Sequence, residues 1–382
     1  LNLYLEYGES FVKYLDGMFA ISIWDTRSKK LLLARDRHGK KPLFYSLKNK
    51  KFYFASEIQS IQKNLNDKTV NFDALNSYLT FLTIPQDQCI FAHIHKVQPG
   101  HILSIDENSE IKITQYCNDK LNYLAKPNFK DCEIEFERLL KNAVKKRLIG
   151  DRDVGCFLSG GLDSSLIAIM LSRINTNGFK TFSAGFLESD FNELPFARQV
   201  SKIVDSDHYD IIIKPDIDSI MNKVVRNLGE PYGDSSIVPT FYLSKLASEH
   251  VKVVLSGDGG DEIFGGYNHQ LAWKISFFLQ KIPGLKFLMQ KIPGAKIINR
   301  DQTLTSKIKR MLGSVKYEGL ERYANYHTIF TESEKKKLFK LSDKPLEVNL
   351  DLLNSHYNNF EKMDNADICL RLDQKWLLPN DF

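Results

Sequence analysis

DVGCFLSGGLDSS, at residues 153–165, joins a short apolar run to a glycine-rich turn and the start of a helix. The apolar residues 154–158 are too few for a helix and are typical of a buried strand, whereas residues 163–165 suit a helical first turn. A helix N-terminus offers N–H groups and the positive end of a dipole to an anion, and Gly160 and Gly161 keep side chains out of its way. The stretch therefore predicts a phosphate-binding loop.

Composition favours an enzyme of two domains, because 382 residues with 43% hydrophobic content can bury more than one core. A net charge of +5, with both signs interspersed, gives no nucleic-acid footprint. The 5 cysteines show no CxxC spacing, which argues against a zinc knuckle or disulfide framework and fits a reducing cytoplasm. Apolar runs stay below the ~18 residues of a membrane span, and no signal peptide is expected. We therefore expect a cytoplasmic enzyme without nucleic-acid or membrane contact.

Residues 1–117 predict a first domain built on one antiparallel sheet. Strand-like runs occur at 18–24, 31–34, 42–46 and 51–55, with a helix at 71–82 and a hairpin at 101–113. The polar, irregular residues 118–130 are expected to form a linker.

Residues 131–382 predict a second domain in which strands and helices alternate. Strands are expected at 154–158, 180–186, 208–213 and 251–255, and helices at 132–148, 193–203, 216–228 and 237–249. Such alternation is typical of a parallel sheet flanked by helices. The last of these strands runs into a second glycine-rich stretch, SGDGGDE at 256–262. Both glycine-rich loops should then lie at the carboxyl ends of strands, where such sheets bind ligands.

Neither loop fits two common nucleotide-binding motifs. GxxxxGK followed by Ser or Thr is absent from both, and a GxGxxG that begins at Gly257 fails at Glu262. The loops instead carry carboxylates, at Asp163, Asp258, Asp261 and Glu262. Phosphates tolerate such neighbours when a divalent cation lies between them, and Mg²⁺ held by one or two carboxylates is the usual arrangement. We therefore expect Mg²⁺ on Asp163 and Asp261.

Several stretches carry a family resemblance. SGGLDSS at 159–165 resembles the pyrophosphate loop of the ATP pyrophosphatase superfamily, and SGDGGDEIFGGY at 256–267 resembles the second signature of asparagine synthetases. Four stretches are similar to the later part of a glutaminase domain: LDGMFAISIWD at 15–25, ARDRHGKKPLFY at 34–45, FASEIQSI at 54–61 and VQPGHIL at 97–103. The similarity runs to about residue 270 and resumes at WLLPND near Trp376. The chain therefore resembles the glutamine-hydrolysing asparagine synthetases.

This resemblance implies a two-domain fold that is α+β and then α/β. Part of an N-terminal-nucleophile glutaminase sheet would precede a parallel-sheet synthetase domain of the adenine nucleotide α-hydrolase-like, or PP-loop, type. It also implies a reaction, in which a carboxylate attacks the α-phosphorus of ATP, pyrophosphate leaves, and ammonia from glutamine displaces AMP. Aspartate, converted to asparagine, is the expected carboxylate. Catalysis would then rest on positioning and charge neutralisation.

The resemblance also implies which residues act. ATP and its pyrophosphate are expected at Leu158, Ser159, Gly160, Gly161, Leu162, Asp163, Ser164, Ser165, Ala184, Ser256 and Gly257. The expected catalytic residues are Asp258, Asp261 and Glu262. Asp258 stands where many relatives carry glutamate, so its carboxylate is shorter by one methylene.

Both ends depart from the family pattern. Relatives place a cysteine nucleophile, an NGE motif and a GSD motif before the position of Leu1, and a catalytic lysine after that of Phe382. We therefore expect glutamine hydrolysis and ligation from a longer parent protein, and little ATP binding or turnover from residues 1–382 alone.

Other interpretations stay open. The carboxylate could belong to a uronic acid of a surface polysaccharide, or the chain could be a catalytically silent nucleotide-binding module. QKIPG occurs at Gln280 and again at Gln290, which indicates short amphipathic helices across 280–294, with a basic apolar face for a membrane or a lipid-linked sugar as the alternative. A homodimer also stays open.

Overall fold

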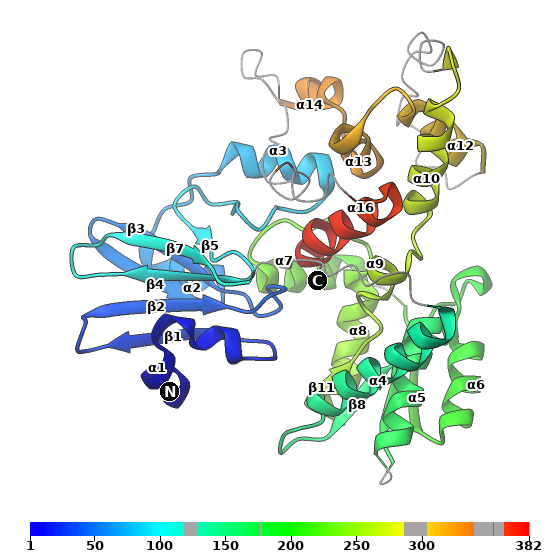
Figure 1. Cartoon of the computed structure of the whole chain (residues 1–382), viewed down its shortest axis with the longest axis horizontal. Helices are drawn as coiled ribbons and strands as arrows, with labels where there is room; N and C mark the ends of the chain where they lie inside the picture. The colour runs from blue at the N-terminus through cyan, green and yellow to red at the C-terminus, as the bar shows by residue number, and fades with distance from the viewer. Residues whose placement is uncertain are drawn as a thin grey trace. The chain divides into compact units, whose positions relative to one another are not determined.

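The chain forms two compact units in the computed structural model, which describes residues 1–117, 128–175, 178–214, 216–285, 304–339, 354 and 363–381. Unit 1 comprises Leu1–Asp119, Val225–Asp234 and Asp261–Phe382, and unit 2 comprises Lys120–Val224 and Ser235–Gly260 (Figure 1). The chain therefore leaves unit 1, builds most of unit 2, and later returns to unit 1.

The first part of unit 1 contains two antiparallel sheets, so the expectation of one sheet was wrong. The strand orders are β1-β2-β6-β7 and β4-β3-β5. The strands are β1 (Ala20–Asp25), β2 (Lys30–Arg35), β3 (Phe44–Lys48), β4 (Lys51–Ala55), β5 (His95–Lys96), β6 (His101–Ile105) and β7 (Ile111–Gln115). All but the short β5 coincide with predicted strands apart from their ends.

A buried carboxylate explains why β2 and β3 enter different sheets. Asp36 follows β2, is 2% exposed, and accepts hydrogen bonds from the amides of His38, Lys40 and Lys41. It also accepts one from the amide of Phe19. These bonds hold a sharp turn, so the chain leaves the first sheet instead of extending it. Local strand propensity carries no information about such a turn.

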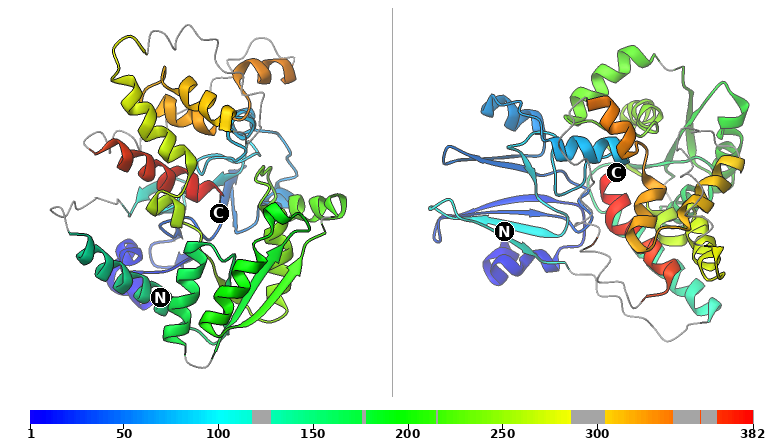
Figure 2. Two further views of the ribbon diagram at one scale, coloured as in Figure 1. Left: turned by 90° about the vertical axis from the view of Figure 1, so that its right-hand side faces the viewer. Right: turned by 90° about the horizontal axis from the view of Figure 1, so that it is seen from above.

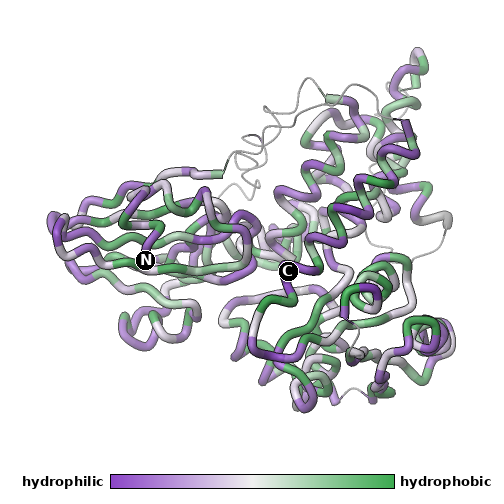
Figure 3. Tube along the Cα trace, turned by 60° about the horizontal axis from the view of Figure 1, so that its bottom comes forward, coloured by the Kyte–Doolittle hydropathy of each residue, from purple (hydrophilic) through white to green (hydrophobic). Residues whose placement is uncertain are grey.

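The two sheets pack face to face and are covered by helices on their outer faces. Leu33, Val97 and Leu103 belong to the apolar layer between the sheets. β2 is apolar from Leu31 to Ala34, because helices cover one face of its sheet and the second sheet covers the other. Figure 3 shows the hydropathy of the residues along the trace. The covering helices are α1 (Asn2–Tyr7) and η1 (Gly8–Tyr14) on the first sheet, and α2 (Ile58–Leu65) and α3 (Phe72–Phe81) on the second. Of these, α3 confirms the predicted helix and α2 was not predicted.

Unit 2 is built on a parallel sheet of order β10-β9-β8-β11, which confirms the predicted alternation. Its strands are β8 (Val154–Phe157), β9 (Lys180–Gly185), β10 (Asp207–Ile212) and β11 (Val253–Leu255). Its helices are α4 (Phe129–Arg147), α5 (Leu162–Ile174), η2 (Ser189–Phe191), α6 (Leu194–Val204), α7 (Ile217–Leu228) and α8 (Ile237–Ser248), with the end of α7 in unit 1. One apolar cluster joins α4, α5 and α6 to β8, and another joins α8 to β9. Figure 2 shows the helices of unit 2 beside its sheet. Both central strands are therefore covered by helices.

The last part of unit 1 is helical. Its elements are α9 (Gly260–Phe264, with Gly260 itself in unit 2), α10 (Asn268–Gln280), α12 (Leu304–Ser314), α13 (Gly319–His327), α14 (Glu332–Phe339), α16 (Asn365–Leu372), the π-helical turn η3 (Asp373–Leu377) and α17 (Leu378–Asp381). Trp273, Tyr323 and Trp376 lie in one apolar cluster that joins α10, α13 and η3. The second glycine loop is shorter than predicted, because α9 already begins at Gly260.

The predicted amphipathic helices at 280–294, and their membrane-facing alternative, fall outside the described residues beyond residue 285. Among the described residues, no helix has the length and apolarity that crossing a bilayer requires.

Candidate functional site

The first glycine loop connects β8 to α5 and has little room for side chains. Gly160 has φ +83°, and a Cβ built there would lie 2.6 Å from the backbone nitrogen of Ala197 at the start of α6. Only glycine fits here, because other residues are strained at this φ and because the backbone atoms next to the added Cβ cannot move aside as a flexible side chain could. Gly161 is the N-cap of α5 and brings no side chain to its first-turn amides. The predicted strand, loop and helix are confirmed.

Two serines fix the shape of this loop. Ser159 Oγ lies 3.0 Å from Ser164 Oγ and accepts a 3.1 Å hydrogen bond from the amide of Gly161. Ser164 Oγ lies 3.2 Å from the Gly161 carbonyl and accepts from the amide of Ser159 at 3.3 Å. Ser165 Oγ, in the first turn of α5, is buried without a hydrogen-bond partner among the described residues. The loop is therefore held in shape by the hydroxyls of its own serines.

The second loop lies against the first. Because β11 pairs in parallel with β8, both loops leave the same edge of the sheet. A Cβ at Gly257 would lie 2.8 Å from the amide nitrogen of Ser164, and a Cβ at Gly260 would overlap the carboxylate of Asp163. Glycine at both positions is what allows this approach. The prediction that both loops lie at the carboxyl ends of strands is confirmed, and their close approach is an addition from the structure.

The remaining residues predicted in unit 2 lie around the same sheet edge. Leu158 is 2% exposed, and its amide donates a 2.9 Å hydrogen bond to the carbonyl of Phe182 on β9, the strand that also carries Ala184. Asp258 is exposed, and its carboxylate accepts a 2.6 Å hydrogen bond from the hydroxyl of Ser256. Leu162 is the exposed first residue of α5.

The predicted residues Asp261 and Glu262 belong to unit 1 and differ in exposure. Glu262 is only 1% exposed and accepts a 2.8 Å hydrogen bond from the hydroxyl of Tyr267, and burial raises the pKa of its carboxyl. The Asp261 carboxylate lies against Gly266, and its backbone carbonyl accepts a 3.1 Å hydrogen bond from Gln270. The roles assigned to both carboxylates from the sequence stay predictions.

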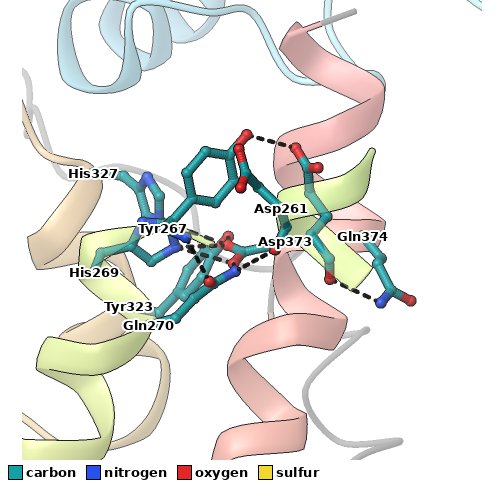
Figure 4. A network of polar contacts seen from close by, with 9 residues as sticks. Asp261, Tyr267, His269, Gln270, Tyr323, His327, Asp373 and Gln374 are labelled. Carbon is teal, nitrogen blue, oxygen red and sulfur yellow. Dashed lines mark hydrogen bonds and ion pairs between the residues drawn. The ribbon is translucent and has the colours of Figure 1, made fainter. Parts of the chain in front are cut away.

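A polar network centred on Asp373 was missed by the sequence analysis (Figure 4). Asp373 is fully buried in η3, and its carboxylate accepts hydrogen bonds from Tyr323 Oη at 2.6 Å and Gln270 Nε2 at 2.7 Å. His269 Nε2 lies 3.1 and 3.0 Å from the two carboxylate oxygens. Burial works to raise the pKa of Asp373, but the hydrogen bonds and charges of its neighbours hold it below the ordinary value.

His327 lies beside this network. Its Nε2 lies 4.0 Å from Asp373 Oδ1 and is buried without a hydrogen-bond partner among the described residues. Burial lowers the pKa of His327 to about 3, so its imidazole is neutral at pH 7. Nothing local in the sequence marks these residues, which come from separate helices.

The Asp373 network also supports α9. Gln270 donates from Nε2 both to Asp373 and to the backbone carbonyl of Asp261. Gln374, the next residue in η3, donates a 3.0 Å hydrogen bond to the backbone carbonyl of Glu262. The helix that carries two predicted catalytic carboxylates is therefore positioned by side chains from α10 and η3.

Known families match both parts of the chain. The asparagine synthase family matches residues 135–382, which is more than half of the chain. The chain belongs to the asparagine synthase family. The glutamine amidotransferase domain family matches residues 1–117.

Curated members of the asparagine synthase family are longer than this chain. Glutamine-hydrolysing asparagine synthetase 1 of Bacillus subtilis is 32% identical over 96% of this chain and 58% of its own length. Glutamine-hydrolysing asparagine synthetase 3 of the same organism is 31% identical over 70% of this chain and 46% of its own length. The chain thus spans about half the length of these relatives.

Among solved structures, a glutamine-dependent NAD⁺ synthetase from Acinetobacter baumannii in complex with adenosine diphosphate aligns with 90% of this chain and 82% of its own. The sequence identity is 14% and the TM-score is 0.29, and a likeness this low supports no inference.

Proposed function

We propose that this member of the asparagine synthase family contributes the ATP-binding edge of an enzyme that amidates a carboxylate through an acyl adenylate. The observation that carries the proposal is the close packing of two glycine loops at the carboxyl ends of the adjacent strands β8 and β11. Ligands of open parallel sheets bind at this edge. The proposed carboxylate is aspartate, the ammonia comes from glutamine, and AMP and pyrophosphate are released.

The residues of the first loop fit a pyrophosphate group. Gly160 and Gly161 keep the N-terminus of α5 free of side chains, and Ser165 Oγ is a buried hydroxyl without a partner among the described residues. A helix N-terminus with open backbone amides is a ready anion site. We assign the departing pyrophosphate to residues 159–165, and the rest of the nucleotide to Leu158, Ala184 and the start of the second loop at 256–257.

We assign Mg²⁺ to Asp163 and Asp261. The Asp163 carboxylate lies against Gly260, so it faces the second loop from the first turn of α5. A magnesium ion bound there would neutralise phosphate charge and help to orient the α-phosphorus. Asp258 and Glu262 are the further acidic residues of the proposal. Asp258 is exposed and can meet a substrate amino group or incoming ammonia, whereas buried Glu262 would act by supporting α9.

Residues 1–117 would supply part of the domain that provides ammonia. The match of this region to the glutamine amidotransferase domain supports the assignment. The cytoplasm is the proposed compartment, since Cys89, Cys117, Cys132, Cys156 and Cys369 are all free thiols.

Exchange of labelled pyrophosphate into ATP tests this proposal on the protein at the length that its gene encodes. Exchange that depends on aspartate and Mg²⁺ is the expected result, and Asp163→Asn should reduce it by about 100-fold, the order found when one charge-stabilising group is lost. Asp205→Asn is the matched control, because Asp205 caps the distant C-terminal end of α6 in a left-handed conformation that asparagine also adopts.

If exchange occurs with a uronic acid and not with aspartate, the uronic acid is the substrate in place of aspartate. No exchange with either carboxylate would indicate a silent nucleotide-binding module.

A further inference from the structure

Three potential metal-binding atoms meet inside the helical part of unit 1. One nitrogen from each of His269 and His327 and an oxygen of Asp373 lie within 4.8 Å of one another (Figure 4). The three residues come from α10, from the end of α13 and from η3, so only the tertiary structure brings them together. Two imidazoles and a carboxylate form a donor set that suits Zn²⁺ and similar ions, whereas Mg²⁺ prefers oxygen ligands.

The distances between these atoms lie on either side of the distance that a metal site requires between its ligand atoms. Zn²⁺ binds imidazole nitrogen and carboxylate oxygen at roughly 2.1 Å, which puts neighbouring ligand atoms of a tetrahedral site about 3.4 Å apart. His269 Nε2 lies 3.0 Å from Asp373 Oδ2, and His327 Nε2 lies 4.0 Å from Asp373 Oδ1. Small side-chain rotations of the two histidines would bring both distances to the required value.

A hydrogen-bonded network alone does not explain the position of the His327 ring. Its Nε2 is buried without a hydrogen-bond partner among the described residues, although buried polar atoms are nearly always paired. A bound cation would satisfy this nitrogen.

A second layer of groups already orients the carboxylate. Tyr323 Oη and Gln270 Nε2 donate to Asp373 at 2.6 and 2.7 Å, as outer partners commonly do for ligands in metal sites. Gln270 also reaches the backbone of Asp261, so the cluster is coupled to α9.

We propose that His269, His327 and Asp373 bind one divalent transition-metal ion of the Zn²⁺ class, which ties α10, α13 and η3 together and steadies α9. A water molecule would occupy the fourth position. This site uses none of the side chains assigned above to Mg²⁺ or ATP, and it stands whether or not the chain acts as a ligase.

Calorimetric titration of the chelator-treated chain with Zn²⁺ tests the proposal, with Co²⁺ as a spectroscopic probe. The expected result is one ion per chain, a raised melting temperature and the visible absorption of tetrahedral Co²⁺. His327→Gln and His269→Asn should each weaken Zn²⁺ binding by more than about 100-fold, since loss of an outer partner alone costs 10–100-fold. Tyr323→Phe is the matched control, because it keeps all three ligands and should weaken binding by at most about 100-fold.

The outcomes separate this site from the proposed function. Asp163→Asn should retain the wild-type affinity for Zn²⁺ even where pyrophosphate exchange is lost. A folded chain that binds no Zn²⁺, or that binds it equally well with both histidines replaced, would overturn the proposal. If a histidine variant does not fold, carbethoxylation of the wild-type chain with and without Zn²⁺ decides. Zn²⁺ should protect both His269 and His327, and unchanged modification of the two rings would also overturn the proposal.

Discussion

The glycine-loop edge of unit 2 and the Asp373 network of unit 1 are polar sites of opposite construction. The loop edge is made of backbone atoms and short side chains from two contiguous stretches, and glycine creates its space. The Asp373 network consists of long side chains from three helices, and it lies among the buried rings of an apolar cluster.

This difference separates sites that a local sequence encodes from sites that only packing creates. A strand, a glycine turn and a helix start are adjacent in the chain, so their geometry follows from backbone preferences. A buried carboxylate needs partners to offset the loss of water, and here those partners come from distant helices. The same contrast predicts how the two regions respond to substitution.

Asp373→Ala should have the largest effect on stability. It leaves the donors of Tyr323, Gln270 and His269 without their buried acceptor, and we expect a loss of about 4 kcal/mol in the free energy of unfolding. Urea denaturation measures it. Asp367→Ala, on the more exposed first turn of α16, is the control and should cost well under about 1 kcal/mol. Equal effects of the two variants would contradict the importance of the network.

Gly160→Ala tests the glycine-made loop. The substitution adds strain at φ +83° and a contact of 2.6 Å with backbone atoms of α6, so we expect a loss of about 3 kcal/mol. Gly178→Ala is a close match, because Gly178 has φ +80° and nothing within 4 Å of its added Cβ. The control should cost only about 1 kcal/mol for the backbone strain. Thermal unfolding of both variants measures the difference, and similar losses would mean that the approach of α6 is unimportant.

The stability of the metal-free chain should depend on pH through His327. Burial lowers its folded-state pKa to about 3, below the ordinary value of 6.5, so between these limits the unfolded chain binds more protons than the folded one. Stability contributed by the neutral ring is therefore present above about pH 6.5 and is lost as the pH falls toward 3, by up to about 1.4 kcal/mol per pH unit.

Denaturation of the chelator-treated protein at several pH values measures the slope of the free energy of unfolding against pH. His327→Gln should reduce it, and His250→Gln, which alters a ring stacked on Tyr209 in unit 2, should leave it unchanged. A slope that is the same in His327→Gln and wild type would rule out the burial of a neutral His327.

Ser164→Ala should have the smallest effect. It removes the hydroxyl that bonds Ser159 and Gly161 across the first loop, at a cost of about 1 kcal/mol. Ser172→Ala on the same helix is the control, since its hydroxyl donates to the carbonyl of Ile169 one turn earlier and does not bridge the loop. Thermal unfolding should show a smaller loss for Ser172→Ala. A reversed order would indicate that the loop does not depend on its serines.

Prediction from the sequence succeeded where the signal was local. The strand at 154–158, the turn at Gly160 and the helix that follows appear as predicted, because chain neighbours make all three. The position of both glycine loops at the carboxyl ends of strands was also predicted, since strands in parallel βαβ units end at the same edge.

Prediction failed where one side chain recruits distant partners. Asp36 turns the chain into a second sheet by gathering four amides, and strand propensity does not report such a turn. The helix α2 follows β4 closely and buries Ile58 and Ile61, but its eight residues give a weak periodic signal. The burial of Glu262 was likewise invisible, because in the sequence it is only one more acid of a polar loop.

The sequence by itself determined the two glycine loops, the parallel sheet that carries them and the family to which the chain belongs, because backbone geometry and contiguous motifs are local properties. Only the tertiary structure decided that Asp373 sits fully buried among His269, Gln270, Tyr323 and His327. Those side chains lie up to 104 residues apart along the chain, and no pattern of neighbours specifies which of them will share a buried charge.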